Sequence, residues 1–342
     1  MIQKMFASDN NSGIHPAILE AISRSNNGHV PSYGDDAYTL SAISKIKEHF
    51  GKNSEVLFAF NGTGANITGL KAMVRSHQAI ICTEGANIHT DEGGAAEGFI
   101  GGKLLTAPSP DGKLTISQIE KQLHNIGNPQ RSQPKAISIS QCTELGTVYT
   151  IEEIKEITSF AHANGLYVYM DGARLSNAAA HLGCSLAEMT GDAGIDMLTF
   201  GGTKNGLMVG EAIICFRGEL ASELKYIRKQ SMQLGSKMRF VSAQFERLLT
   251  DGLWLENASQ ANRMAQLLAE GLRNFPGISL TQPVESNAVF AAIPKLLIGQ
   301  LQKSYAFAIW NASANEIRLV TSFDTAEEDI QLFLSQVEKF YS

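Results

Sequence analysis

The sequence predicts an α/β protein with a large domain, built around a mostly parallel sheet that helices cover, and a small C-terminal α+β domain. Short apolar, β-rich runs alternate with helix-sized amphipathic segments up to about residue 218, the pattern of crossover connections in a parallel sheet. Glycines gather at the ends of these runs, and after Gly218 the pattern becomes mainly helical. We therefore place the large domain, with an N-terminal arm, at residues 1–250 and the small domain at residues 251–342.

Local patterns justify the individual elements. The apolar runs before residue 218 predict strands at 56–60, 79–82, 136–140, 166–170 and 197–200. A helix is predicted over 65–74, and capping boxes that begin at Thr115 and Thr150 predict two more, the second ended by Gly165. Beyond residue 218 we expect helices to about residue 275, strands at 288–292 and 317–320, and a last helix opened by a capping box at 325–328.

Composition excludes several classes of protein. Hydrophobic residues make up 44% of the 342 residues and charged residues 18%, which suits a packed core and not a disordered chain. A net charge of −6 leaves no basic excess for phosphates, so we expect no nucleic-acid partner. The apolar runs are too short to span a membrane, and residues 1–11 lack the apolar core of a signal peptide. With four widely spaced cysteines and no zinc spacing, we expect a soluble cytoplasmic protein.

Residues 56–66 form the first candidate site, in which an apolar strand runs into the turn Gly62-Thr63-Gly64 and a helix. Free N–H groups at a helix N-terminus, the helix dipole and the Thr63 hydroxyl together favour a phosphate. A dinucleotide-binding turn is the alternative, because Glu84 lies where a ribose-binding acid would stand. However, Ile67 occupies the place of the third glycine in that motif.

The second and third candidates are Asp171 and Lys204. Asp171 ends an apolar strand, at the sheet edge where open α/β folds bind ligands, and Arg174 follows it closely. Asp171 could also simply cap the next helix. Lys204 stands in a glycine-rich loop after a strand, which favours an imine-forming lysine. A phosphate cradle, a strand-end aspartate and a loop lysine together match pyridoxal phosphate, which needs an anion at its pyridine nitrogen and a lysine imine.

Over most of its length the chain resembles the L-threonine aldolases of the low-specificity type, in the β-eliminating lyase group of fold-type-I pyridoxal-phosphate enzymes. The combination of Asp-Gly-Ala-Arg-Leu at 171–175 with Thr203-Lys204 is highly specific. Further matching segments are Ser8-Asp9, 34–38, 61–66, His89 with 91–94, Asn177-Ala178, Met238-Arg239 and 317–321. The resemblance implies the aspartate-aminotransferase-like fold, and cleavage of L-threonine or L-allo-threonine to glycine and acetaldehyde.

The resemblance also implies roles for single residues. Lys204 forms the imine, Asp171 pairs with the pyridine nitrogen, and His89 stacks on the cofactor ring. The phosphate is held by Gly62, Thr63 and Gly64, with Arg239 of a neighbouring subunit. Ser8, Arg174 and Arg318 bind the substrate carboxylate, and Arg174 also lies near the cofactor. The family is typically a homotetramer, a dimer of dimers with shared active sites, and no metal is implied.

One departure from the family pattern concerns the proton-accepting group. Where relatives often read Glu-Asn-Thr-His, this chain has Gln141-Cys142-Thr143-Glu144. The base that takes the proton of the substrate hydroxyl is therefore either His89 or a water held by Glu144. A nicotinamide oxidoreductase and a non-catalytic sugar- or amino-acid-binding protein are alternatives from other classes. An aminotransferase or a β-eliminating lyase is the alternative with the same cofactor.

Overall fold

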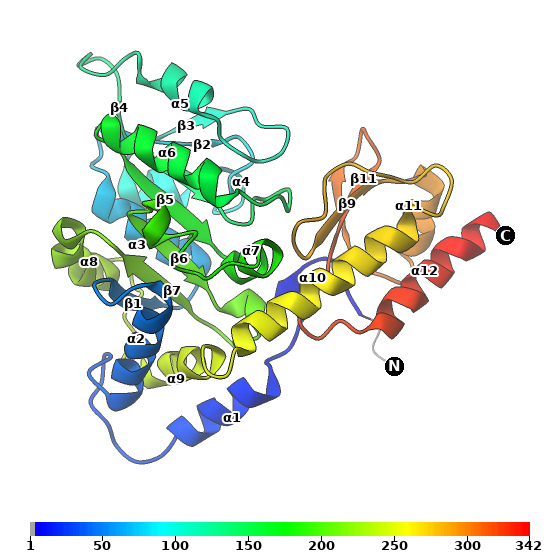
Figure 1. The fold of residues 1–342 in the computed structure, drawn as a ribbon, viewed down its shortest axis with the longest axis horizontal. Coiled ribbons are helices and arrows are strands. Elements are labelled where there is room, and N and C mark those ends of the chain that lie inside the picture. Colours follow the sequence, from blue (N-terminus) through cyan, green and yellow to red (C-terminus); the bar gives the residue numbers. More distant parts are fainter. Residues whose placement is uncertain (1–3) are drawn as a thin grey trace.

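The computed structural model, which describes residues 4–342, contains two sheets (Figure 1). The larger has the strand order β1-β7-β6-β5-β4-β2-β3, in which β7 runs antiparallel to both neighbours and the remaining adjacent pairs are parallel. The predicted helix-covered and mostly parallel sheet is confirmed. Its strands are β1 (Glu55–Ala59), β2 (Gln78–Thr83), β3 (Lys103–Ala107), β4 (Gln133–Ser140), β5 (Tyr167–Gly172), β6 (Met197–Gly201) and β7 (Glu211–Cys215).

Helices cover both faces of this sheet because neighbouring strand residues are apolar on both sides. In β2, Ile80 packs towards α3 and α8, whereas Ile81 packs into the larger cluster on the opposite face. Tyr169 and Met170 of β5 divide between the two faces in the same way. One face carries α3 (Gly62–Met73) and α8 (Gly218–Gln230). The other carries α1 (Pro16–Ser25), α2 (Ala37–Phe50), α5 (Ile116–Leu123), α6 (Ile151–Ala163), α7 (Leu175–Leu182) and α9 (Arg239–Leu248).

Capping chemistry sets several helix starts. Thr115 and Thr150 each form the expected reciprocal box, with Gln118 and Glu153, at the starts of α5 and α6. The predicted box at 325–328 is wrong by one residue: α12 (Glu327–Tyr341) begins after Ala326, whose N–H donates to Asp329 at 2.9 Å. Thr325 instead accepts a bond from the Ser322 N–H at 2.9 Å, because it closes the preceding turn.

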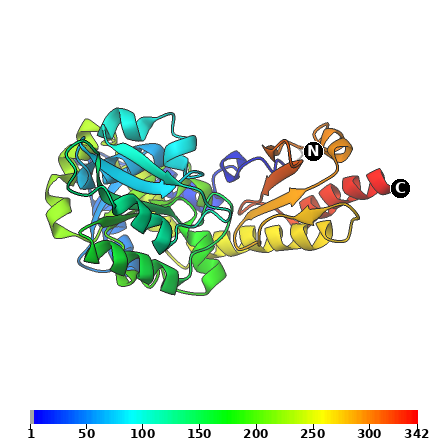
Figure 2. The same ribbon diagram turned by 90° about the horizontal axis from the view of Figure 1, so that it is seen from above.

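The second sheet is antiparallel, in the order β10-β11-β9-β8. Its strands are β8 (Ser279–Leu280), β9 (Ala288–Ala292), β10 (Ala308–Asn311) and β11 (Glu316–Val320), and it packs with α10 (Leu253–Leu272), α11 (Lys295–Leu301) and α12. Figure 2 shows this small unit beside the large sheet, with α10 running along it. α10 also contacts α7, so one helix joins the two units.

The N-terminal segment adds to the small unit. Phe6 is fully buried in the core of the small sheet, and its N–H donates to Ala306 O at 2.9 Å while its carbonyl accepts from Val320 N at 2.8 Å. Its neighbour Asp9 bonds to the large sheet's helix layer, as described below. The N-terminal arm therefore crosses between the two units. The domain boundary at residue 250 stays a prediction.

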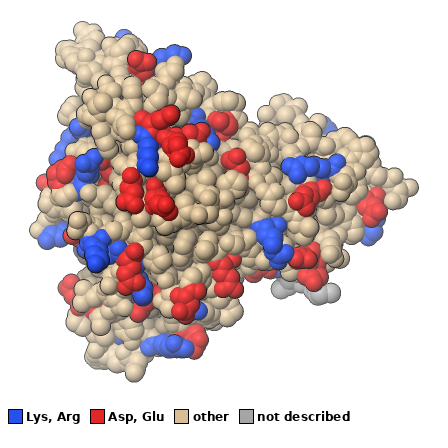
Figure 3. Space-filling view, viewed as in Figure 1, with Lys and Arg blue, Asp and Glu red and all other residues tan. Residues whose placement is uncertain are grey.

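Surface charge is mixed. On the face in Figure 3, acidic and basic side chains alternate, and neither sign gathers into one broad patch. Within residues 4–342, no helix combines the length and the apolarity that crossing a bilayer requires.

The carboxyl ends of β5 and β6 approach each other so closely that glycine is required there. A Cβ on Gly201 would lie 2.3 Å from the Ala173 carbonyl oxygen, and one on Gly172 would lie 2.4 Å from the Thr199 carbonyl oxygen. Because these neighbours are backbone atoms, they cannot rotate away. The two glycines thus let Asp171 and the loop after β6 come together.

We expect Gly201→Ala to lower the free energy of unfolding by about 1–3 kcal/mol, because the added methyl overpacks a rigid backbone contact. Urea titration of the purified protein measures this change. Gly218→Ala is the matched control, since a Cβ there meets nothing within 4 Å, and it should leave stability unchanged or slightly raised. Equal stabilities for the two variants would contradict the close approach.

Candidate active site

A cavity of about 450 Å³ lies at the carboxyl edge of the large sheet. The ends of β1, β5 and β6 and the start of α3 line it, as expected for a ligand site in an open α/β sheet. Its walls are Asn10, Phe60, Asn61, Gly62, Thr63, Asn66, Asn87, Asp91, Glu92, Asp171, Ala173, Thr203, Lys204, Val209 and Glu211. The three sequence candidates, Gly62-Thr63, Asp171 and Lys204, therefore meet in one place.

The α3 N-terminus forms one wall. Asn61 caps it by accepting the Gly64 N–H at 2.7 Å, and Gly62 and Thr63 face the cavity in the first turn, where helix N–H groups lack intrahelical partners. A Cβ on Gly64 would lie 2.3 Å from the Gln233 amide, which itself accepts the Phe60 N–H at 3.0 Å. A side chain at 64 would displace the Gln233 amide from this hydrogen bond, and the wall suits an anion.

Asp171 is held in a defined orientation at the end of β5. Its side chain is 5% exposed, Oδ1 accepts the Ala173 N–H at 2.9 Å, and Oδ2 accepts from the Asn66 amide at 3.0 Å. The same Asn66 nitrogen donates to Glu92 at 2.9 Å, while Asn66 Oδ1 accepts the Tyr169 hydroxyl at 3.0 Å. Asn66 therefore orients two carboxyl groups at once.

Two further carboxyl groups in the cavity have no assigned role from the sequence. Burial, with the nearby charge of Asp171, raises the pKa of Glu92 to about 7, and its Oε2 is buried without a hydrogen bond in residues 4–342. Burial also raises the pKa of Glu211 to about 7, and Glu211 accepts the Gly202 N–H at 2.9 Å. Glu211 could have been found from the sequence as an acidic residue at the start of the apolar run that forms β7.

Lys204 lies in the turn η4 (Thr203–Asn205), directly after β6. The positive charge of Arg174 and burial together lower the pKa of its amine below the ordinary value. A neutral amine is the nucleophilic form, so the surroundings favour attack on a carbonyl carbon.

The guanidinium of Arg174 forms a two-point ion pair with Asp9. Nε lies 2.7 Å from Oδ2 and Nη2 lies 3.0 Å from Oδ1, so Nη1 stays outside the pair. Asp9 is 1% exposed and also accepts from the Asn287 amide at 3.0 Å. Burial alone would raise the pKa of Asp9, but the charges of Arg174 and Lys204 outweigh this effect and bring the pKa below its ordinary value. The carboxyl group therefore stays ionised.

Arg318 reaches the same region from β11. With Arg174 and Glu144 it lines a space of about 10 Å³, enough for roughly one water. Its Nε is buried without a hydrogen bond in the described residues, and burial and the charge of Arg174 lower its pKa. Two guanidinium groups thus converge, and within the described residues only Arg174 has an ion-pair partner, Asp9, so the site suits a carboxylate.

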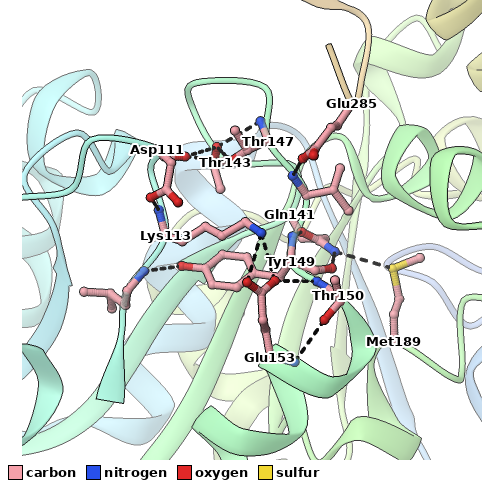
Figure 4. Close-up of polar contacts among 12 residues, drawn as sticks. Asp111, Lys113, Gln141, Thr143, Thr147, Tyr149, Thr150, Glu153, Met189 and Glu285 are labelled. Atoms are coloured by element: carbon pink, nitrogen blue, oxygen red, sulfur yellow. Dashed lines mark hydrogen bonds and ion pairs between the residues drawn. The ribbon is translucent and has the colours of Figure 1, made fainter. Parts of the chain in front are cut away.

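Glu144 is half-buried beside these arginines. It accepts the Ser140 hydroxyl at 2.6 Å and the Asn87 N–H at 3.0 Å, and burial raises its pKa. The loop that carries it is held on both sides (Figure 4). Gln141 and the backbone of Tyr149 exchange two bonds, at 2.9 and 3.0 Å, and Glu285 accepts the Val148 N–H at 2.7 Å. The loop is therefore a rigid support for the carboxyl group.

Four sequence candidates, Ser8, Gly64, His89 and Arg239, line neither this cavity nor the small space beside Arg318. His89 is exposed on α4 (Asn87–Thr90), whose first residue, Asn87, lies in the cavity wall, and the stacking of His89 on a bound ring stays a prediction. Ser8 caps the turn η1 (Asp9–Asn11) by accepting the Asn10 N–H at 3.2 Å. Arg239 donates to the carbonyl of Gly28 at 3.1 Å, away from the cavity.

Comparison with known proteins agrees with this geometry. A sequence profile for β-eliminating lyases matches residues 5–294. The low-specificity L-threonine aldolase of Pseudomonas sp. strain NCIMB 10558 is 43% identical, over 99% of this chain and 98% of that protein. That of Pseudomonas aeruginosa is 44% identical, over 96% and 95%. The threonine aldolase structure from Leishmania major superposes with a TM-score of 0.94 at 33% identity, over 98% of this chain and 99% of that one.

A match of this length, on a chain that brings Asp171, Lys204 and the α3 N-terminus into one cavity, means that the protein belongs to the β-eliminating lyase family.

Proposed function

We propose that the protein is a pyridoxal-phosphate-dependent aldolase that cleaves L-threonine or L-allo-threonine to glycine and acetaldehyde. The observation that carries the proposal is the meeting of Lys204, Asp171 and the α3 N-terminus in one cavity at the sheet edge. The two Pseudomonas relatives bear the name of this activity. The nicotinamide alternative loses support, because Glu84 is exposed and lies outside the cavity walls.

The residues present fit the cofactor. The α3 N-terminus with Gly62, Thr63 and Gly64 suits its phosphate, the oriented carboxylate of Asp171 suits a protonated ring nitrogen, and the Lys204 amine suits imine formation. The buried and unpaired Oε2 of Glu92, next to Asp171, indicates a polar group in this cavity. When bound, the cofactor supplies a sink for the electrons of the broken Cα–Cβ bond.

The chain's own residues position the substrate. Arg174 and Arg318 bind the carboxylate, since both guanidinium groups line one small space and, within the described residues, only Arg174 has an ion-pair partner, Asp9. Ser8 lies next to Asp9 and stays a proposed contact. Asp171 keeps the ring nitrogen protonated, which stabilises negative charge that develops only as the bond breaks.

Glu144 is the proposed proton acceptor, directly or through a water in the space that it shares with the arginines. Its raised pKa brings the carboxyl nearer to the working pH, which favours general-base catalysis. His89, the other sequence candidate for the base, is exposed on α4 and stays a proposed stacking partner of the cofactor ring.

We also propose the homotetramer with shared sites, and a cytoplasmic location. The cavity wall carries four carboxyl groups, Asp91, Glu92, Asp171 and Glu211, and one amine, Lys204. Because the imine uses Lys204, the wall offers no other cation to a bound phosphate. Arg239 of a neighbouring subunit would supply one, as the family resemblance implies.

We expect Lys204→Ala to lose threonine cleavage and the visible absorbance that borohydride bleaches in the cofactor-loaded wild type. Absorbance spectra before and after borohydride, with an acetaldehyde assay, measure both. Lys237→Ala, at an exposed lysine, is the control and should behave as wild type. A Lys204→Ala protein that keeps a bleachable chromophore would assign the imine to another lysine.

Asp171→Asn should still bind the cofactor, through the phosphate and the imine, but lose roughly 100-fold or more in kcat, because the ring nitrogen is no longer kept protonated. Equilibrium dialysis gives the cofactor content and steady-state kinetics give kcat. A variant with nearly wild-type kcat would remove Asp171 from this role.

Glu144→Gln should reduce kcat/KM by roughly 100-fold, the effect of losing a general base, and His89→Asn should reduce it less. Kinetics on L-threonine and L-allo-threonine test both variants, and a changed ratio between the two substrates would mean that Glu144 lies beside the hydroxyl-bearing carbon. If His89→Asn proves the more damaged enzyme, the assignment of the base is wrong.

A further inference from the structure

Arg318 lies between two aromatic side chains on the small sheet. In β11 it pairs across the sheet with Phe290 of β9 and with Ala308 of β10. Its guanidinium carbon is 5.0 Å from the centre of the Trp310 indole, within the range of a cation–π contact. Phe290 meets the same indole edge to face, with ring centres 5.3 Å apart and an angle of 83°. Phe290 thus holds the Trp310 indole in place, and the indole face lies against the Arg318 guanidinium.

The backbone of β10 aims Trp310 at this position. The register between β10 and β11 shifts between Ile309 and Asn311, so Trp310 is the extra residue of a β-bulge. Bulges recur next to active sites, where they redirect a side chain. Trp310 remains 36% exposed and lies outside the apolar clusters of the structure, so it contributes little to the core.

The two arginines of the carboxylate site are therefore held by different means. Asp9 binds Arg174 through two hydrogen bonds and neutralises its charge. Within residues 4–342, Arg318 has no ion-pair partner, and its fixed contact is the uncharged indole. A carboxylate at that place would cancel the charge that a substrate needs, whereas an aromatic face orients a guanidinium and leaves its edge and its charge available.

We propose that Trp310 is a positioning residue, whose indole holds the Arg318 guanidinium edge-on to the substrate carboxylate. The inference rests on the proposed function, because it takes an α-amino acid as the ligand of this site. It assigns to Trp310 a part in binding the carboxylate and none in breaking the Cα–Cβ bond.

The test compares glycine with glycinamide, which lacks the carboxylate, as ligands of the cofactor-loaded enzyme. Trp310→Leu keeps apolar bulk but removes the π face, and should weaken glycine binding by about 5- to 30-fold, the range of a partly buried cation–π contact. Glycinamide binding and kcat for threonine should stay at wild-type values, while KM rises with the glycine Kd. Trp310→Phe should recover most of the affinity.

Ile309→Ala is the matched control, because Ile309 is a neighbouring, 46% exposed residue of the same strand, paired with the core residue Ile317 and not with Arg318. Arg318→Ala sets the largest loss that the site can show. Fluorescence gives a second readout: with Trp254→Phe, Trp310 is the remaining one of the two tryptophans, and glycine should change its emission.

Unchanged glycine affinity in Trp310→Leu would overturn the inference, and so would an equal loss for glycine and glycinamide, which would mean a general disturbance of the pocket. Threonine cleavage by the wild type is measured separately. A protein that cleaves threonine but shows either of these results keeps its proposed function and loses only the role of Trp310.

Discussion

The ion pair between Asp9 and Arg174 joins the parts of the molecule on which the site depends. Arg174 precedes α7 in the large unit, Asp9 belongs to the N-terminal arm, and the Asn287 amide links the same carboxylate to the start of β9. A buried pair of this kind is costly to desolvate and strongly destabilising to break, so it fixes geometry more than it adds stability. The arm, the large sheet and the small sheet therefore meet at one charged contact, directly beside Lys204.

Electrostatics explains why so many acids can share the cavity. Four of its charged wall residues are acidic, yet burial moves the pKa of Glu92 and of Glu211 to about 7, and both can hold a proton near neutral pH. Asp171 differs in its contacts, because the Asn66 amide and the Ala173 N–H each donate to one of its oxygens and fix the orientation of its carboxyl group. One oriented carboxyl group thus stands where a cationic ring nitrogen would lie, among carboxyl groups that can be neutral.

The parts predicted from sequence are those that local patterns determine. The alternation of strands and helices, the boxes at Thr115 and Thr150, and the strand-end positions of Asp171 and Lys204 all arise within a few residues of chain. The pairing of Asp9 with Arg174 joins residues far apart in sequence, and no local pattern encodes it. Sequence could not predict that Asn87 lies in the cavity wall for a similar reason, because which residue of a four-residue helix faces a cavity depends on how that helix packs. β3 and β7 were missed because one is a half-exposed edge strand and the other starts with an acid.

The division of labour between the two sheets follows from these contacts. The large sheet carries the groups that would act on the breaking bond, Asp171 and Lys204, on backbone that close glycine contacts hold in place. The small sheet contributes Arg318, held by an aromatic face on an exposed hairpin and not by a buried pair. Because a cation–π contact is weaker than a two-point ion pair, the small sheet holds Arg318 less firmly than Asp9 holds Arg174. Changes in that sheet should thus alter how tightly an amino acid is held before they alter the chemistry done on it.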